Sequence, residues 1–242
     1  MVLALEEVGV AFGGFRALSG VNLTVAPGQV VGLIGPNGAG KTTCVNVLTG
    51  FQHPTTGRVM LEGRDVSNLG AHRLRRSGVA RTFQAGRLFT GLDVLDNLAC
   101  TGVGLGQRRA AAEHEASDLL AWMGISALES RPAAGLPYTD ERRVAIARAL
   151  MGGPRFLLLD EPAAGMSEAE AADLAALIRR IATERGIGCL LIEHNVGLVL
   201  SVAADVVVLD GGRVIERGDR KVILGSAAVR EAYLGANVTE AA

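Results

Sequence analysis

A glycine-rich stretch near the N-terminus constrains the fold of this 242-residue chain more than any other feature. The apolar run VVGLI (30–34) leads directly into GPNGAGKTT (35–43), and a helical pattern follows through Leu48. This succession fits G-x-x-x-x-G-K-[ST], in which backbone N–H groups and a helix N-terminus surround a phosphate group. The sequence therefore predicts a phosphate-binding loop at the carboxyl end of a buried strand.

The residues of this loop divide the work of holding a nucleotide and its metal ion. We expect Lys41 to reach the β- and γ-phosphates and the Thr42 hydroxyl to ligate Mg²⁺. The motif predicts a nucleotide and Mg²⁺ as cofactors, and the family resemblance given below implies that the nucleotide is ATP. The predicted nucleotide-binding residues are Gly35, Pro36, Asn37, Gly38, Ala39, Gly40, Lys41, Thr42 and Thr43.

Two further motifs supply candidate catalytic residues. FLLLDEP (156–162) places Asp160 at the end of a buried strand, where it can hold the Mg²⁺ shell, and Glu161 directly after it. An Asp-Glu pair at a strand end is often only a helix cap, but beside a phosphate loop it indicates nucleotide hydrolysis, with Glu161 polarising the attacking water. His194 follows the apolar run GCLLIE (188–193), and its place relative to the other motifs favours a functional over a structural role.

Strands and helices alternate along most of the chain. Strands are predicted at 3–10, 21–25, 30–34, 57–63, 78–83, 156–160 and 188–193, and a helix at 167–184. Gly211 and Gly212 predict a hairpin turn between DVVVLD and RVIERG. Apolar strands alternating with helices are typical of a parallel sheet covered on both faces, so the fold class is α/β. Helical patterns between 87 and 151 indicate an insertion into that core.

Charge and composition exclude several classes of function. The formal net charge is −1, so the chain lacks the basic character of a nucleic-acid-binding domain. Its three cysteines are far apart in the sequence, which suits a reducing compartment better than a disulfide framework. Apolar runs such as FLLL (156–159) are far shorter than a membrane span. We therefore expect a soluble, cytoplasmic protein that reaches a membrane only through a partner.

With these motifs in order, the chain resembles the ATP-binding subunit of an ABC transporter from end to end. The order is phosphate loop (35–42), Gln84, signature region (136–141), Asp160-Glu161 and His194. The resemblance implies a P-loop NTPase (RecA-like) core with an N-terminal antiparallel β subdomain and an inserted α-helical signature subdomain. All belong to one domain, 1–242, in which 1–86 and 152–242 form the core and 87–151 the helical subdomain.

The same resemblance assigns roles to further residues. It implies that Gln84 binds Mg²⁺ and the attacking water and senses the transport partner, and that Phe12 stacks on adenine. It also implies that His194 is the switch histidine of the site. The segment 85–100 is expected to form the groove that accepts a coupling helix of a membrane permease.

Finer features are similar to the subfamily that energises uptake of branched-chain amino acids and other hydrophobic or amide compounds. These features are GVARTFQAGRLF (78–89), DEPAAGM (160–166), IEHNVGLV (192–199) and VREAYLG (229–235). Lipopolysaccharide-export ATPases share the tail and the histidine motif but usually differ before the glutamine, so they rank second. The resemblance implies permease subunits, a second ATPase subunit and, indirectly, an external binding protein as partners. It places the chain on the inner face of the cell membrane.

The signature region departs from the family pattern. That pattern is usually Leu-Ser-Gly-Gly-Gln and acts in trans on ATP held by the opposite protomer, whereas this chain has Leu136 followed by Pro137, Tyr138, Thr139 and Asp140. Pro137 offers neither hydroxyl nor N–H, Thr139 adds a Cβ, and Asp140 adds a negative charge near a polyanion. We expect Thr139 to be the N-cap of the following helix and to offer a substitute hydrogen bond.

This departure suggests a heterodimer in which the phosphate loop of this chain forms the competent site and its signature covers a weaker one; a homodimer is the alternative. Two other classes of function compete with the importer subunit. A soluble ABC ATPase acting on DNA or ribosomes usually carries long insertions or basic patches, which are not seen here. A regulatory ATP-binding module with negligible turnover has little use for Glu161 and His194.

Overall fold

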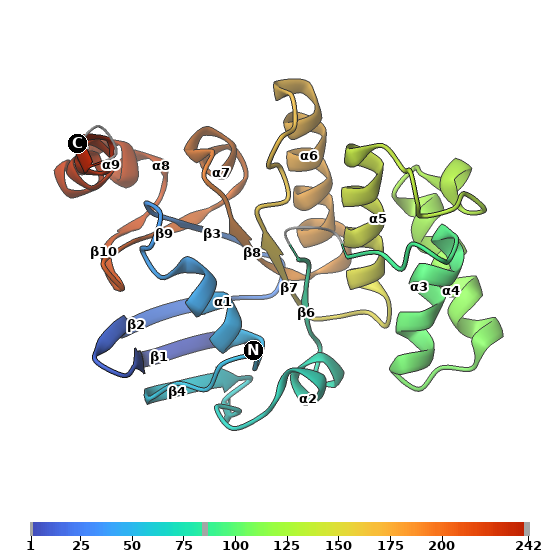
Figure 1. Ribbon diagram of the computed structural model, residues 1–242, viewed down its shortest axis with the longest axis horizontal. Coiled ribbons are helices and arrows are strands. Elements are labelled where there is room, and N and C mark those ends of the chain that lie inside the picture. Colours follow the sequence, from blue (N-terminus) through green and yellow to red (C-terminus); the bar gives the residue numbers. More distant parts are fainter. Residues whose placement is uncertain (1, 84–86, 240–242) are drawn as a thin grey trace.

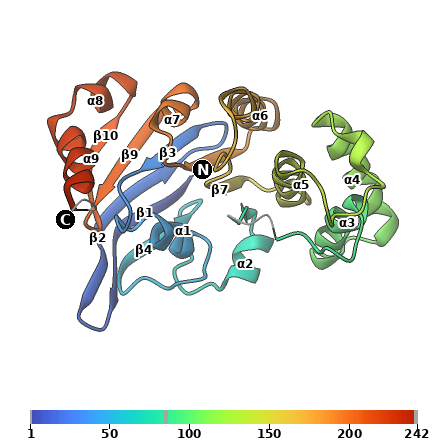
Figure 2. The same cartoon turned by 45° about the horizontal axis from the view of Figure 1, so that its top comes forward.

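The computed structural model describes residues 2–83 and 87–239, with side chains described as far as Tyr233. Gln84, which the sequence predicts to be a metal ligand and catalytic residue, lies outside the described residues. The chain forms two β-sheets, and helices cover the larger sheet on both sides (Figures 1 and 2).

The smaller sheet is antiparallel and has the strand order β2-β1-β4-β5. Its strands are β1 (Leu3–Phe12), β2 (Phe15–Val25), β4 (Thr56–Leu61) and β5 (Arg64–Asp65). β1 and β2 form a hairpin in which Phe12 pairs with Phe15. This sheet is the N-terminal antiparallel part that the resemblance implied.

The larger sheet has the order β10-β9-β3-β8-β7-β6 and is parallel except for the pairing of β10 with β9. Its strands are β3 (Val30–Ile34), β6 (Val79–Arg81), β7 (Phe156–Asp160), β8 (Gly188–Ile192), β9 (Asp205–Asp210) and β10 (Arg213–Gly218). Every residue of β3, β7 and β8 is buried, which explains their continuous apolar runs. The β9–β10 hairpin turns at Gly211 and Gly212, both with positive φ, as the sequence predicts.

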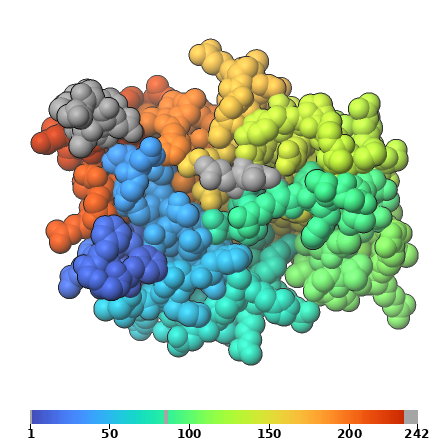
Figure 3. Space-filling model, in the orientation of Figure 1, coloured from blue at the N-terminus to red at the C-terminus, as the bar shows by residue number. Residues whose placement is uncertain are grey.

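The helices fall into groups around the larger sheet. α1 (Lys41–Leu48) lies on one side of it with the antiparallel sheet, and α5 and α6 lie on the other (Figure 1). α3, α4 and α5 gather at one end of the molecule (Figure 3), within the stretch where the sequence predicts helices. The remaining bounds are α2 (Ala71–Arg76), α3 (Val94–Gly104), α4 (Arg109–Trp122), η1 (Ser126–Leu128), α5 (Tyr138–Leu150), α6 (Glu168–Arg185), α7 (Val196–Val202), α8 (Arg220–Gly225) and α9 (Ala227–Thr239). No helix in the described part of the chain is both long and apolar enough to cross a membrane.

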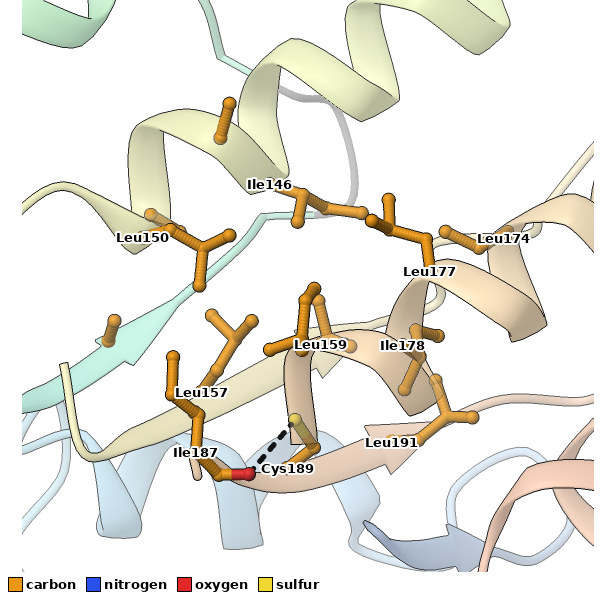
Figure 4. Packing of buried hydrophobic residues seen from close by; sticks show 14 of the residues in the cluster. Ile146, Leu150, Leu157, Leu159, Leu174, Leu177, Ile178, Ile187, Cys189 and Leu191 are labelled. Carbon is orange, nitrogen blue, oxygen red and sulfur yellow. Dashed lines mark hydrogen bonds between the residues drawn. The ribbon is translucent and has the colours of Figure 1, made fainter. Parts of the chain in front are cut away.

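Alternate side chains of β7 enter two different cores. Leu157 and Leu159 pack in the cluster that includes α5 and α6 (Figure 4). Phe156 and Leu158 pack in the cluster that includes α1 and the antiparallel sheet. Because each fully buried large apolar side chain contributes about 1.5–3 kcal/mol, β7 is anchored from both faces. The residue at its carboxyl end, Asp160, is therefore held in a fixed position.

A polar contact at the surface joins α4 to α6. The indole Nε1 of Trp122 donates a hydrogen bond to Glu184 Oε2 over 2.9 Å. The guanidinium groups of Arg180 and Arg185 lie over the same ring, 4.7 and 4.2 Å from its centroid. This Trp122 cluster connects the group of helices α3–α5 to the sheet-covering helix α6.

Candidate functional site

The phosphate loop occupies residues 35–40, between β3 and α1. Gly35, Gly38 and Gly40 all have positive φ, of 151°, 79° and 102°. Such values are readily adopted only by glycine, and they let successive N–H groups turn toward the same side of the loop. Gly40 is also the N-cap of α1, so the helix begins directly at the loop. The glycines of the sequence motif thus form a tight turn directly before the helix, the shape that a phosphate-binding loop requires.

The side chain of Lys41 is folded back over this loop. Its Nζ donates to the carbonyl oxygens of Gly35 and Pro36, over 2.7 and 3.0 Å. Burial lowers the pKa of Lys41, while the nearby charges of Glu161 and Asp160 raise it. The ammonium group therefore lies at the loop, within reach of any group that the loop binds.

An open pocket of about 320 Å³ lies in front of the loop. It brings together residues that are far apart in the sequence: Phe15, Ala17, Asn37, Gly38, Ala39, Gly40, Lys41, Thr42, Thr43, Glu161 and His194. Most of the residues predicted to bind the nucleotide, and two of the three predicted catalytic residues, therefore face one space.

Glu161 and His194 contact each other at this pocket. His194 Nε2 lies 2.7 Å from Glu161 Oε1, and the side chain of Glu161 is largely buried. The backbone of Glu161 has a φ of 48°, an unusual value for a residue other than glycine. Its N–H donates to Ile192 O over 2.9 Å, which ties the residue to the end of β8. The contact holds the Glu161 carboxylate at the pocket, where such a group can act as a general base.

Asp160 ends β7 and is not among the residues that line the pocket. It is 8 % exposed, and its Oδ2 pairs with Arg81 over 2.8 Å. Its backbone N–H donates to Thr82 Oγ1 over 3.3 Å. The sequence motif located this carboxylate but gave no sign of its arginine partner.

Glu193 is a site residue that the sequence motifs did not single out. Its side chain is buried, and it accepts hydrogen bonds from the N–H groups of Ala163 and His194, over 2.6 and 3.3 Å. Burial raises the pKa of this carboxyl, and the charge of Glu161 adds to the effect. A carboxyl residue at the end of an otherwise apolar strand was the available signal. Glu193 therefore connects the loop after Glu161 to the backbone of His194.

The aromatic side chain at the pocket is Phe15. Phe12, predicted to stack on adenine, is 51 % exposed at the end of β1 and is not among the residues that line the pocket. Phe15 is 66 % exposed and does line it. The two residues face each other across the β1–β2 turn. The role of Phe12 remains a prediction, and Phe15 is a second aromatic candidate that the sequence reasoning missed.

The prediction that Thr139 is the N-cap of the signature helix is wrong. α5 begins at Tyr138, and its N-cap is Pro137, whose carbonyl accepts the N–H of Glu141 over 2.9 Å. Proline has a fixed φ and needs no N–H at this position, so the helix begins two residues earlier than expected. Thr139 therefore lies within the first turn, where its side chain cannot cap.

The Thr139 hydroxyl is instead bound within the chain. Its Oγ1 lies 2.5 Å from Glu170 Oε1 on α6. Glu170 also completes a capping box with Ser167, the N-cap of α6. The Thr139 hydrogen bond, followed by those of Ser167, lowers the pKa of Glu170 to about 2. Asp140 is a further acid in the first turn of α5, so this end of the helix carries negative charge.

The four signature residues predicted to act in trans, Pro137 to Asp140, do not line the pocket in front of the phosphate loop. Tyr138 is 43 % exposed, and its ring lies 4.6 Å from the guanidinium group of Arg142. An ideal Cβ on Gly165 would meet the same ring at 3.7 Å. The start of α5 is thus packed against the segment that leads into α6.

Comparisons with known proteins agree with this arrangement. Residues 18–164 match the family described as ABC transporter. The branched-chain amino acid transport ATP-binding protein BraF of Pseudomonas aeruginosa is 40 % identical, over 97 % of this chain and 98 % of its own length. The corresponding protein LivG of Escherichia coli is 37 % identical with the same coverage.

Solved structures give the same result. A nucleotide-free ATP-binding cassette from an ABC transporter has a TM-score of 0.87 and 32 % identity, over 96 % of this chain and 98 % of that one. An ABC transporter cassette in its ADP conformation has a TM-score of 0.86 and 32 % identity, over 97 % and 98 %. With the phosphate loop, Glu161 and His194 gathered at one pocket, this chain belongs to the ABC transporter family of ATP-binding cassettes.

Proposed function

We propose that this chain is the ATP-hydrolysing subunit of an ABC importer for branched-chain amino acids or related compounds. The observation that carries the proposal is the 2.7 Å contact between His194 and Glu161 in the pocket that the phosphate loop lines. A module that only binds ATP needs the loop but has no use for a carboxylate held beside it. The substrate class follows from the relatives, which are described as branched-chain amino acid transport proteins.

The residues of the pocket support a direct hydrolytic mechanism. The loop N–H groups and the α1 N-terminus hold the β- and γ-phosphates, and Lys41 exchanges its carbonyl partners for phosphate oxygens. Glu161 orients a water molecule and accepts its proton as the water oxygen bonds to the γ-phosphorus. The bond from that phosphorus to the β-bridging oxygen breaks, which gives ADP and phosphate. His194 keeps the Glu161 carboxylate in place.

The pocket also suits Mg²⁺. Among the described residues no cluster of three or more His, Cys, Asp or Glu side chains could hold a metal ion. Mg²⁺ needs no such cluster, because it binds through one or two carboxylates, water molecules and substrate phosphates. Thr42 lines the pocket, and Asp160 directly precedes Glu161, which also lines it, so Thr42 and Asp160 would hold the ion, together with Gln84. When bound, Mg²⁺ neutralises charge on the transferred phosphate.

The proposed partners are a permease and a second ATPase subunit at the inner face of the cell membrane, with an external binding protein acting through the permease. Nucleic acid is not a proposed partner. A surface pocket of about 280 Å³ supports the permease contact, because it lies between the core and the α3–α5 helices. Phe51 and Phe83 line it from one side, and Thr101 and Arg148 from the other. We assign residues 87–151 to the helical subdomain and the rest of the chain to the core.

The signature helix favours a heterodimer. Pro137 has no N–H to offer, and the Thr139 hydroxyl is already engaged by Glu170. Asp140 and Glu141 place two negative charges in the first turn of α5, and these charges repel the phosphates of the neighbour's ATP. This chain is therefore the weaker contributor to its neighbour's nucleotide, while its own phosphate loop, facing the partner's signature, forms the competent site.

The test is co-purification with the permease and the second ATPase subunit, followed by uptake of labelled leucine into proteoliposomes. Glu161→Gln in this chain is expected to abolish uptake, and the equivalent substitution in the second subunit to reduce it only partly. Equal losses would contradict the asymmetry. A chain that forms no complex with any permease, or a complex that exports lipopolysaccharide, would contradict the proposed function itself.

A further inference from the structure

Arg81 has no place in the mechanism above, although its surroundings are well defined. It ends β6, three residues before Gln84, and its side chain is 10 % exposed. One terminal nitrogen pairs with Asp160 Oδ2 over 2.8 Å. The other donates to Asn46 Oδ1 on α1 over 2.6 Å. A single guanidinium group thus connects the helix that begins at the phosphate loop with the carboxylate at the end of β7.

Two aromatic rings hold this guanidinium group in place. Its central carbon lies 4.9 Å from the centroid of Phe83 and 5.7 Å from that of Phe51. The rings meet each other edge to face at 5.8 Å. A planar cation on aromatic faces is partly desolvated and restrained, and arginine suits this position better than lysine. Arg81 is therefore positioned by the fold as well as by its charge.

The charge of Asp160 requires a partner in this environment. A buried carboxylate without a counter-ion is strongly destabilising, whereas a paired and hydrogen-bonded carboxylate is not. Among the described side chains, Arg81 makes the ion pair with Asp160, while Lys41 donates to the carbonyl oxygens of the loop. The pair uses Oδ2 of the carboxylate, and Oδ1 has no hydrogen bond with another described residue.

We propose that Arg81 is a positioning residue of the nucleotide site, the counter-ion that holds Asp160 while no metal ion is bound. The inference rests on the proposed function, in which Asp160 carries the Mg²⁺ shell. Arg81 balances the charge of Asp160 in the metal-free protein by pairing with Oδ2, which leaves Oδ1 for the cation. Its positive charge also opposes the arriving cation, so Arg81 limits the strength of Mg²⁺ binding.

Arg81→Met tests this role because methionine keeps an apolar stem between Phe51 and Phe83 and removes the charge. The melting temperature of the metal-free chain is expected to fall by about 10 °C, since Asp160 loses its partner. Mg²⁺ then compensates the unpaired charge of Asp160. The ratio of the ADP dissociation constant in EDTA to that in excess Mg²⁺ is therefore expected to rise about tenfold above the wild-type ratio. Both quantities are measured on the purified full chain, by thermal unfolding and by calorimetric titration.

Arg75→Met is the matched control. Arg75 is a partly buried arginine that donates to the carbonyl oxygens of Ala149 and Met151 and has no direct contact with Asp160. Its loss is expected to lower the melting temperature without changing the ratio of the two dissociation constants. Arg81→Lys keeps the charge and is expected to keep the ratio within about twofold of wild type.

An unchanged ratio in Arg81→Met, with lowered stability alone, would show that Arg81 is only structural and would overturn the inference. If Arg81→Met gives no folded protein, Arg81→Gln keeps a donor for Asp160 without the charge, and the same rise in the ratio is expected. An unchanged ratio there would overturn the inference equally. Failure of the proposed function is distinct, because it would appear as a wild-type chain that forms no permease complex or as a complex that exports lipopolysaccharide, whereas the ratio is measured on the isolated chain.

Discussion

Gly35 opens the phosphate loop in a crowded position, and Gly38 lies three residues later in an open one. An ideal Cβ on Gly35 would overlap the carbonyl oxygen of Leu209 on β9 and lie 3.1 Å from Ala39 Cβ. An ideal Cβ on Gly38 would have no described heavy atom within 4 Å. Both residues have positive φ, so Gly35→Ala and Gly38→Ala separate the effect of crowding from that of backbone strain.

The structure gives different magnitudes for the two substitutions. At Gly38, with a φ of 79°, alanine adds only the strain of a left-handed backbone, which costs roughly 1–2 kcal/mol. At Gly35, with a φ of 151°, the strain is about 1–3 kcal/mol, and moving the β9 backbone adds about 1–3 kcal/mol. Gly35→Ala is therefore expected to lower the free energy of unfolding by about 2–6 kcal/mol, and the melting temperature by roughly 5–20 °C.

Urea unfolding followed by circular dichroism measures both variants against wild type, with thermal unfolding as a second reading. In order of decreasing free energy of unfolding, we expect wild type, then Gly38→Ala, then Gly35→Ala. Equal destabilisation of the two variants, within about 0.5 kcal/mol, would refute the reasoning that β9 limits the space at Gly35. The parallel pairing of β3 with β9, in which Ile34 is the partner of Val208, is what brings this carbonyl so close.

Two further predictions concern the pocket and the signature helix. Glu161→Gln is expected to keep the nucleotide affinity within about twofold of wild type. It is expected to lower the ATPase rate of the assembled transporter at least about 100-fold, because the proton acceptor beside His194 is lost. Retained turnover would show that another residue is the general base. Thr139→Val removes the main cause of the low Glu170 pKa, about 2 against an ordinary 4.5. A lowered carboxyl pKa stabilises the fold above pH 4.5, and this contribution is lost as the pH falls toward 2. The stability difference between wild type and Thr139→Val should thus be full at neutral pH and narrow below pH 4.5, as urea unfolding across that range would reveal; a pH-independent difference would contradict it.

The parts of the fold that depend on local pattern were predictable from the sequence. The apolar run at 30–34, the glycines after it and the helix to Leu48 form one continuous signal, and the structure confirms all three. The predicted helix at 167–184 is observed at Glu168–Arg185 with Ser167 as its N-cap. Periodicity and turn residues act over a few positions, so they are visible without tertiary contacts.

The contacts that connect distant segments were not predictable. Arg81 reaches Asp160 because β6 pairs with β7 in parallel, with Arg81 opposite Leu158, and no local pattern encodes that neighbour. Thr139 reaches Glu170 because α5 lies beside α6. The N-cap of α5 was misplaced because a threonine before acids looks like a cap, whereas Pro137 already supplies the backbone geometry.

Trp122 is the single tryptophan of the sequence, and it lies where α4 meets α6. Its indole ring is surrounded by Arg180, Arg185 and Glu184 from the sheet-covering helix, while its backbone belongs to the opposite group of helices. Any rotation of α3–α5 relative to the sheet would pull the ring away from these charges and into water. The intrinsic fluorescence of the unlabelled protein is therefore a built-in reporter of that movement, readable in real time as nucleotide is added.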